Sequence, residues 1–278
     1  MRRFVITIVS LGLSASCWAS APKTANSDVD PVVAAHRVLD QALHDSNAEK
    51  RAQAVAATGA VGLHPDAVRA VEAALHDKDL LVREMAAATL GVMQSRHSIP
   101  ALRATLDDRP EVSFTAALSL WDMGDRTGRN VLIAVLTGKE KDSPGLVQGA
   151  LRSVGRTFHN PGEMAMLGVH GAADLMGPAG MGVGLAEDAT KDGDAPGRAL
   201  AAIHLGRDSD PATLAVLQAA LTDKRSSVRA AVARALGQRG TPSSIAKLQP
   251  LLSDSHARVR LEAAAAILRL GEERATRR

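Results

Sequence analysis

Aromatic side chains and cysteine are scarce in this sequence. It has no Tyr, three Phe and two Trp, so aromatic residues make up 2% of the chain, and it has a single Cys. β-Sandwiches and β-barrels depend on β-branched and aromatic side chains, so this composition argues against both. A chain with one cysteine forms no internal disulfide, so packing alone has to hold the fold together.

Small aliphatic residues are abundant instead. The 278 residues include 51 alanines, and hydrophobic residues make up 46% of the chain against 23% for charged residues. This balance is typical of a globular protein and too apolar for a disordered one. Alanine has the highest helix propensity and lets helices approach each other closely, so the composition predicts an all-α protein.

The first 21 residues are typical of an export signal. Two arginines follow the first Met, and the apolar run Phe4–Ser16 then leads to small residues ending at Ala21. This run is too short to span a bilayer comfortably. We therefore predict a signal peptide at 1–21, a flexible leader at 22–34, and export to the periplasm or the cell envelope.

Cys17 raises the question of a lipid anchor. Lipoprotein signals place Leu three residues before the cysteine, and this chain has Ser14 there. A soluble exported form that loses Cys17 with its signal is therefore favoured, and an anchor at Cys17 is the alternative.

The charge of the predicted mature chain is close to neutral. Without the two signal arginines it has 31 basic and 30 acidic residues, and arginines alternate with aspartates along it. A nucleic-acid-binding protein would have a clustered basic stripe. We therefore expect no nucleic-acid partner.

A motif recurs along the chain at intervals of about 31 residues. Its clearest copies are residues 223–240 and 254–271, which begin with Asp, have Val-Arg five residues later and close an alanine-rich segment with Gly. The frame is anchored at seven positions, 50, 82, 112, 146, 197, 228 and 259. In the third frame the aspartate is assigned to Asp107.

Each unit is predicted to hold two helices joined by a turn. In the last unit Thr241 and Pro242 form a typical helix start. In the unit before it, Val228, Val232 and Leu236 lie on one face of the second helix. A single pair of this size cannot bury its apolar faces, so neighbouring pairs have to stack into a solenoid.

The pattern D-x4-V-R-x2-A-x3-L-G-x2-G resembles the HEAT repeat, in particular the short bacterial type grouped with phycobilisome-lyase-like HEAT proteins. The resemblance covers about residues 35–271, which leaves a charged C-terminal tail at 272–278. It implies an α-solenoid of about seven helical hairpins in a right-handed superhelix.

The resemblance also implies a ladder, in which an arginine of each second helix bonds the aspartate of an inter-helix turn. The arginines that match this position are Arg51, Arg83, Arg198, Arg229 and Arg260. Ser113 and Val147 interrupt the ladder. These Asp–Arg pairs are interpreted as structural rather than as acid–base groups.

Searches for catalytic chemistry find no support in the sequence. Deoxyhypusine hydroxylases share the implied architecture and bind two irons through His-Glu pairs, but none of the nine His is followed by Glu. Bilin lyases of similar architecture act on cytosolic antenna proteins, which an export signal contradicts. Phosphate-loop, nucleophile-elbow and zinc-helix motifs do not occur. No catalytic, cofactor or metal site is therefore predicted.

One interval of the repeat is 51 residues long, and its extra residues fall within 160–186. This insertion holds four Met and seven Gly. The favoured interpretation is an extra helix with a glycine-rich loop over the core. A surface for a protein or peptide and shallow, peripheral membrane contact are the alternatives. The candidate contact residues are Met164, Met166, Met176 and Met181.

Phe114 and Trp121 lie seven residues apart, on one face of the second helix of the third repeat. Trp121 occupies the place where other repeats have Gly. Core filling is the favoured interpretation. An outward-facing Trp that anchors a partner is the alternative, so both residues are further candidate contacts.

The sequence therefore predicts a non-catalytic exported scaffold that presents a curved HEAT surface to a protein partner. The alternative is an enzyme or enzyme-accessory protein, lyase-like or metal-binding, with a site near the insertion. The polar residues available for such a site are His159, Glu163, His170 and Asp174.

Overall fold

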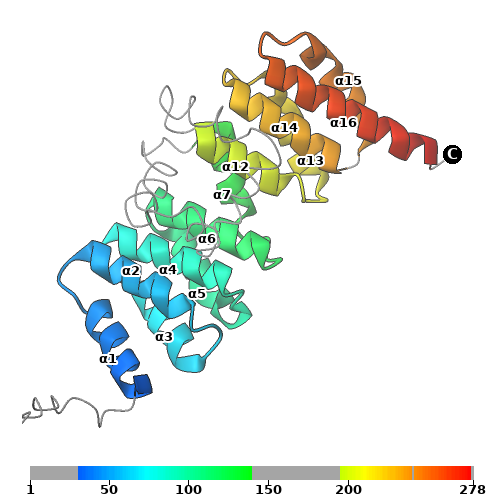
Figure 1. The fold of residues 1–278 in the computed structure, drawn as a ribbon. Coiled ribbons are helices and arrows are strands. Elements are labelled where there is room, and N and C mark those ends of the chain that lie inside the picture. Colours follow the sequence, from blue (N-terminus) through cyan, green and yellow to red (C-terminus); the bar gives the residue numbers. More distant parts are fainter. Residues whose placement is uncertain (1–30, 140–194, 240, 277–278) are drawn as a thin grey trace, which may run out of the picture. The chain divides into compact units, whose positions relative to one another are not determined.

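The computed structural model describes residues 31–139, 195–239 and 241–276, and all regular elements in these ranges are helical. The predicted all-α fold is thus confirmed. The chain divides into two compact units, residues 1–38 and 39–278. Helix α1 (Pro31–Leu43) begins in the first unit, and the other described helices belong to the second (Figure 1).

The second unit consists of helix pairs joined by short turns. The first helices are α3 (Pro65–Ala74), α5 (Ile99–Ala104), α7 (Arg129–Thr137), α13 (Pro211–Ala219) and α15 (Ile245–Leu248). The second helices are α2 (Ala48–Gly59), α4 (Leu80–Val92), α6 (Pro110–Asp122), α12 (Ala195–Leu205), α14 (Ser226–Arg239) and α16 (Ala257–Thr276). Short 3-10 segments flank the first helices at η1 (Arg96–Ser98), η2 (Thr105–Asp107), η3 (Ala220–Thr222), η4 (Pro242–Ser244) and η5 (Gln249–Ser253).

Six of the seven predicted second helices lie in the described residues. The seventh, at position 146, lies outside them, as do the predicted signal peptide at 1–21 and the insertion at 160–186. Two helices cross the predicted domain bounds. Helix α1 begins at Pro31, inside the predicted leader, and α16 continues to Thr276, inside the predicted tail.

Helices α7 and α12 pack against each other although residues 138–194 separate them in the sequence. The Nε atom of Arg198 on α12 donates to the carbonyl oxygen of Leu136, near the end of α7, at 3.1 Å. At the other end of α7, Arg129 pairs with Asp208 and Asp210 at 2.8 and 2.6 Å. Helix α12 is therefore the second-helix partner of α7, and the repeat is interrupted inside this pair.

Successive second helices meet through small residues. A Cβ atom on Gly206, directly after α12, would lie 2.9 Å from the Cα atom of Ala235 on α14. One on Gly237 of α14 would lie 2.8 Å from the Cα atom of Ala266 on α16. Any side chain at these two positions would push the helices apart, so glycine sets their spacing.

The buried apolar side chains form two clusters that both include residues of α6. Ala116 and Leu120 of α6 belong to the cluster that extends back to α2. Ala117 and Trp121 belong to the cluster that extends forward to α16. Since these residues alternate along α6, the helix supplies two faces to two cores, and its outward surface is small.

The predicted ladder is present, and four of its five arginines reach forward to the turn of the next repeat, whereas Arg260 bonds its own turn. Arg229 on α14 donates from Nε and Nη2 to the two carboxylate oxygens of Asp254, at 2.8 and 2.9 Å. Its Nη1 atom donates to the backbone carbonyl of Asp223 in its own turn, at 2.7 Å. In the described ranges these pairs are Arg51–Asp77, Arg83–Asp108, Arg198–Asp223 and Arg229–Asp254.

The third turn differs from the sequence assignment. Asp108, and not Asp107, accepts the two bonds from Arg83, at 2.7 and 2.9 Å. This turn is one residue shorter than the others because α6 begins with Pro110. Ser113 replaces the arginine of α6, and its hydroxyl donates to the carbonyl of Leu106 in η2 at 2.7 Å, so α6 makes neither of the two ladder bonds.

The ladder predicts a defined acid sensitivity. Hydrogen bonds from Arg229 hold the pKa of Asp254 at about 2, below its usual range. Because an unfolded aspartate titrates near about 3.9, the stabilisation by this pair is complete above about pH 4 and is lost as the pH falls toward 2. We expect Asp254→Asn to lower the free energy of unfolding at pH 7 by about 1.5–3 kcal/mol and to weaken its decline in acid.

Urea unfolding at pH 7, 4 and 3 tests this expectation. The matched control is Asp107→Asn, because Asp107 is exposed and lies outside the ladder. Equal stability of the two variants at pH 7 would contradict the role of the Arg229–Asp254 pair.

Candidate partner-binding surface

The ladder joins the inter-helix turns 45–47, 77–79 and 107–109 to one another, and it joins 223–225 to 254–256. We call these five turns together the turn edge. Arg83, for example, bonds both its own turn and the next one, through the carbonyl of Asp77 and the carboxylate of Asp108. The turns bridged in this way lie next to each other. Side chains at matching turn positions therefore face the same surroundings.

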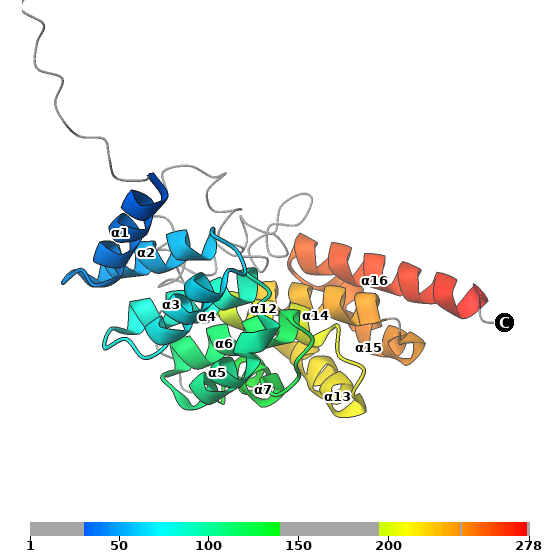
Figure 2. The ribbon, with the colours of Figure 1, turned by 90° about the horizontal axis from the view of Figure 1, so that it is seen from below.

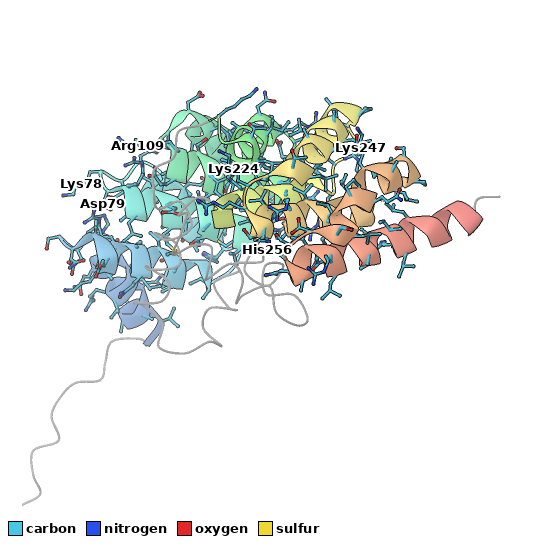
Figure 3. The ribbon with its side chains drawn as sticks, turned by 90° about the horizontal axis from the view of Figure 1, so that it is seen from above. Lys78, Asp79, Arg109, Lys224, Lys247 and His256 are labelled. Atoms are coloured by element: carbon cyan, nitrogen blue, oxygen red, sulfur yellow. The ribbon has the colours of Figure 1, made fainter. Side chains whose placement is uncertain are left out.

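Three exposed cations occupy the same position on the turn edge. They follow a ladder aspartate directly and are Lys78, Arg109 and Lys224 (Figure 3). None of the three charged groups forms an ion pair or a side-chain hydrogen bond with another residue of the described ranges. In the first and last turns the same position holds Ser46 and Ser255, which are also exposed. We call the three residues the turn cations.

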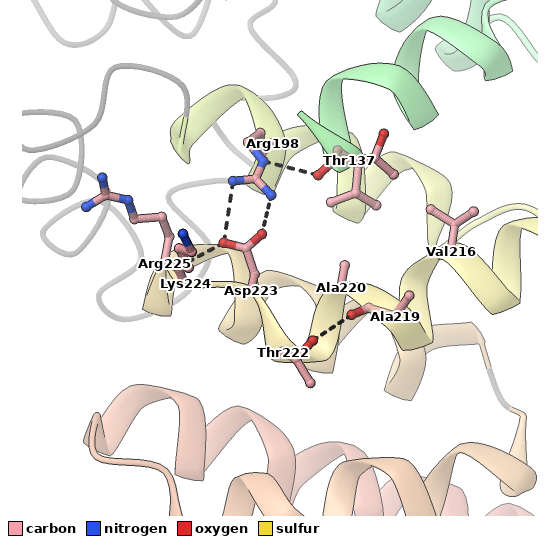
Figure 4. A pocket seen from close by; sticks show the side chains of 10 residues that line it. Thr137, Arg198, Val216, Ala219, Ala220, Thr222, Asp223, Lys224 and Arg225 are labelled. Atoms are coloured by element: carbon pink, nitrogen blue, oxygen red, sulfur yellow. Dashed lines mark hydrogen bonds and ion pairs between the residues drawn. The ribbon is translucent and has the colours of Figure 1, made fainter. Parts of the chain in front are cut away.

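A pocket of about 800 Å³ opens beside Lys224 (Figure 4). Leu136 of α7, Val216 and Ala219 of α13, and Ala220 of η3 form its apolar side. The pocket exists because α7 ends beside the first helix of the following repeat. An apolar side chain of a partner would find aliphatic contacts here.

The other side of this pocket is charged. Arg198 crosses it and is fixed at both ends, to the carboxylate of Asp223 and to the carbonyl of Leu136. Lys224 and Arg225 follow Asp223 at the rim. Three cations against one carboxylate give the lining a positive charge, so the pocket favours an anionic group near its rim.

The candidate contacts Phe114 and Trp121 are both buried, with 2% of their surface exposed. Both belong to the core cluster that joins α6 to α16. Core packing thus replaces the contact role that was considered for them from the sequence. The other candidates, Met164, Met166, Met176 and Met181, lie outside the described residues.

The surroundings of Trp121 explain why it stands where other repeats have Gly. Among the described helices, α6 and α12 contact each other far less than α4 and α6 or α12 and α14 do, and α7 packs against both. The wider space takes an indole ring. The Arg126 guanidinium lies over this ring, 4.0 Å from its centroid, and the indole Nε1 is buried without a hydrogen-bond partner in the described ranges.

Sequence reasoning missed a buried acid on α4. Glu84 is 9% exposed, and its Oε1 atom accepts a hydrogen bond from the hydroxyl of Thr115 on α6 at 3.5 Å. Burial, together with the nearby Glu111 carboxylate, raises the pKa of Glu84 to about 8. The equivalent residue of α14 is Ala230. The one feature of the sequence that could have indicated the buried acid is therefore a Glu at a repeat position that holds Ala in α14.

Neither a metal-binding cluster nor a membrane-spanning helix is present in the described ranges. The described ranges contain no group of three or more His, Cys, Asp or Glu side chains placed to hold a metal ion. The polar residues named for a metal-binding alternative, His159, Glu163, His170 and Asp174, lie outside these ranges. Of the helices that the structure describes, none has the length and apolarity needed to cross a bilayer.

Comparison with protein families identifies the repeat. A family model described as HEAT repeats matches residues 36–121 and 184–275. The chain therefore belongs to the HEAT-repeat family, and its described part is a helical scaffold of that type. A sequence comparison with curated proteins finds no match.

Several solved structures are similar to this chain. A crystal structure of an engineered protein shares 19% identity over 85% of this chain and 96% of its own, with a TM-score of 0.49. Human deoxyhypusine hydroxylase in complex with glycerol shares 22% identity over 85% and 96%, with a TM-score of 0.37. The complex of CpcE and CpcF of phycocyanin lyase from Nostoc sp. PCC7120 shares 19% identity over 90% and 98%, with a TM-score of 0.39.

The burial of Trp121 predicts a pair of stability effects. Trp121→Ala leaves a cavity, so we expect the free energy of unfolding to fall by about 3–5 kcal/mol. Trp121→Phe keeps most of the apolar volume and removes an N–H group that has no acceptor among the described residues, so its cost is expected to be below about 2 kcal/mol. Urea unfolding measures both. Two similarly small losses would show that the ring is not a core residue.

The buried carboxyl of Glu84 predicts a loss of stability in alkali. Its folded pKa is raised, so its contribution to stability is complete below about pH 4.5 and is lost as the pH rises through 8. We expect the wild type to lose on the order of 2 kcal/mol between pH 5 and 9, whereas Glu84→Gln does not. Thermal unfolding across this range tests it, with Glu49→Gln, an exposed acid on α2, as the control. Parallel profiles for Glu84→Gln and the wild type would contradict it.

Proposed function

We propose that this protein is a non-catalytic scaffold that binds an acidic surface of a partner protein along its turn edge. The observation that carries the proposal is the recurrence of an exposed cation, Lys78, Arg109 or Lys224, at one position of three turns. These three charged groups form no ion pair in the described ranges. The ladder arginines beside them, in contrast, are all paired with turn aspartates.

The geometry of the turns supports recognition rather than chemistry. Every ladder aspartate accepts bonds from an arginine and from the backbone at the start of the next helix, as Asp77 does from Arg51 and from the amide of Asp79. The same bonds lower the pKa of Asp77 below its usual range. A carboxylate held in this way is a poor proton acceptor, so the ladder fixes the turn cations and leaves recognition to them.

The pocket beside Lys224 supplies the apolar part of the surface. An acidic segment with one aliphatic or small aromatic side chain would place its carboxylates near Lys224 and that side chain against Leu136 and Val216. Apolar anchors of this kind carry most of the affinity of an interface, and charges at the rim mainly set its specificity and association rate.

Export is the second part of the proposal. It rests on residues 1–21, with their two arginines, apolar run and small terminal residues. The partner is therefore expected in the periplasm or at the envelope. Loss of residues 1–21 from the protein recovered in an envelope fraction, read by mass spectrometry of its N-terminus, would support this location.

Affinity capture from the native envelope fraction tests the binding surface. The bait is the chain without residues 1–21, beside a variant that combines Lys78→Glu, Arg109→Glu and Lys224→Glu. Rim charges each contribute about 0.5–1 kcal/mol, so we expect the triple reversal to weaken capture of a discrete partner by at least about tenfold. The control is Lys247→Glu, because Lys247 is an exposed cation on α15, away from the turn edge (Figure 3).

A further variant separates the turn edge from the insertion. Capture that is lost on deletion of residues 162–184 but kept by the triple reversal would overturn the turn-edge proposal and place the contact on the insertion. Capture that both variants keep would overturn both locations.

A further inference from the structure

Helix α16 carries the most exposed leucines of the described ranges. Leu261 and Leu268 are 70% and 69% exposed. Ala257, Ala265 and Gly271 are exposed on the same helix, as is Arg269 beside Leu268. In Figure 2 α16 is the long red helix beside α14 and α15. We call Leu261, Ala264, Ala265 and Leu268 the α16 stripe.

The repeat register shows what such a face does elsewhere. Leu261 and Leu268 stand 31 residues after Ala230 and Gly237 of α14. Ala230 is 1% exposed, and Gly237 lies directly against Ala266 of α16. The stripe therefore lies at the positions through which a second helix receives its neighbour.

The helix before α14 follows the same rule. Ala199 of α12 is buried, and Gly206 lies against Ala235 of α14. The face is thus a helix-docking face in each pair of successive second helices from α12 to α16. On α16 it is presented to solvent instead.

The size of the residues on α16 departs from the internal pattern. Leucines replace an alanine and a glycine, so another HEAT second helix could not approach α16 as closely as α16 approaches α14. Leu261, Ala264 and Leu268 are spaced three and four residues apart, which is the spacing of a coiled-coil seam. The stripe therefore suits a helix that packs at the wider distance of a coiled coil.

We propose that the α16 stripe is a homodimer contact, in which α16 packs antiparallel against α16 of a second copy of this chain. A two-fold axis beside Ala264 and Ala265 would place Leu261 of each copy against Leu268 of the other. The stripe is self-complementary about that axis because it has a leucine at each end and alanines in the middle. Two-fold contacts of this kind are the commonest form of homo-oligomer.

Two charged groups of α16, Glu262 and Arg260, are bonded within their own copy. Glu262 accepts from Arg234 of α14 at 3.0 Å, and Arg260 donates to the carbonyl of Asp254 at 2.7 Å. Both charges are directed toward their own copy, so closing the seam strands neither of them. The contact of two 20-residue helices lies at the low end of interface sizes, and we expect a dissociation constant on the order of 10 µM.

Sedimentation equilibrium of the chain without residues 1–21, from 1 to 200 µM, tests the dimer. The wild type should change from monomer to dimer over this range. The double variant Leu261→Glu/Leu268→Glu should remain a monomer with an unchanged thermal midpoint, because both side chains are exposed. The control is Leu63→Glu, which alters an exposed leucine of the α2–α3 loop and should still dimerise.

A cysteine experiment tests the antiparallel geometry. The chain without residues 1–21 has no cysteine, so Ala264→Cys introduces one thiol beside the proposed axis. It should form a covalent dimer under mild oxidation, and Leu63→Cys should not. A wild type that stays monomeric at 200 µM, a double variant that still dimerises, larger oligomers, or a dimer that Ala264→Cys does not cross-link would each overturn the proposal.

Discussion

The arginine that reaches from one second helix to the next turn is the interaction on which the rest of this structure depends. Arg229 bonds the carbonyl of its own turn with one nitrogen and the carboxylate of Asp254 with two others. One side chain therefore sets both the end of one helix pair and the start of the next. The core is made largely of alanine and leucine, whose apolar contacts have no preferred direction. The arginine bonds therefore set the orientation of one helix pair relative to the next. A surface feature placed on one turn is consequently repeated, in register, on its neighbours.

The α7–α12 pair shows how the array continues across a long interruption of the sequence. Asp223 still binds Arg198, but the carbonyl that Arg198 also binds comes from Leu136, at the far side of residues 138–194. Arg129 and Arg239 add bonds to residues 208–210 from α7 and α14. The bond from Arg198 to Leu136 stands in place of the bond that Arg229 makes to the carbonyl of Asp223 in its own turn. The same junction creates the pocket beside Lys224, so the interruption and the candidate site have one structural origin.

The repeat could be predicted from the sequence because small residues, turn aspartates and arginines that the fold needs recur with its period. The departures from the repeat could not be predicted in this way. The third turn is one residue shorter than the others, so Asp108 and not Asp107 binds the ladder arginine. No sequence rule predicts the length of a turn with a precision of one residue. The pocket depends on α7 lying beside α13, which nothing local indicates. Glu84 is buried because a neighbouring second helix covers its position in the repeat, and a pattern of residue types cannot give the pKa that results from that burial.

Trp121 and Leu268 break the same rule in different surroundings. Both are large residues at the place where a second helix otherwise carries Gly. At Trp121 the described helices α6 and α12 make few contacts with each other, α7 packs against both, and the ring is buried. At Leu268 no described helix covers the position, so the side chain is exposed. A large residue at this position therefore indicates that the next helix packs at a wider spacing. Within the array the chain itself provides that helix, and at α16 a second copy can provide it.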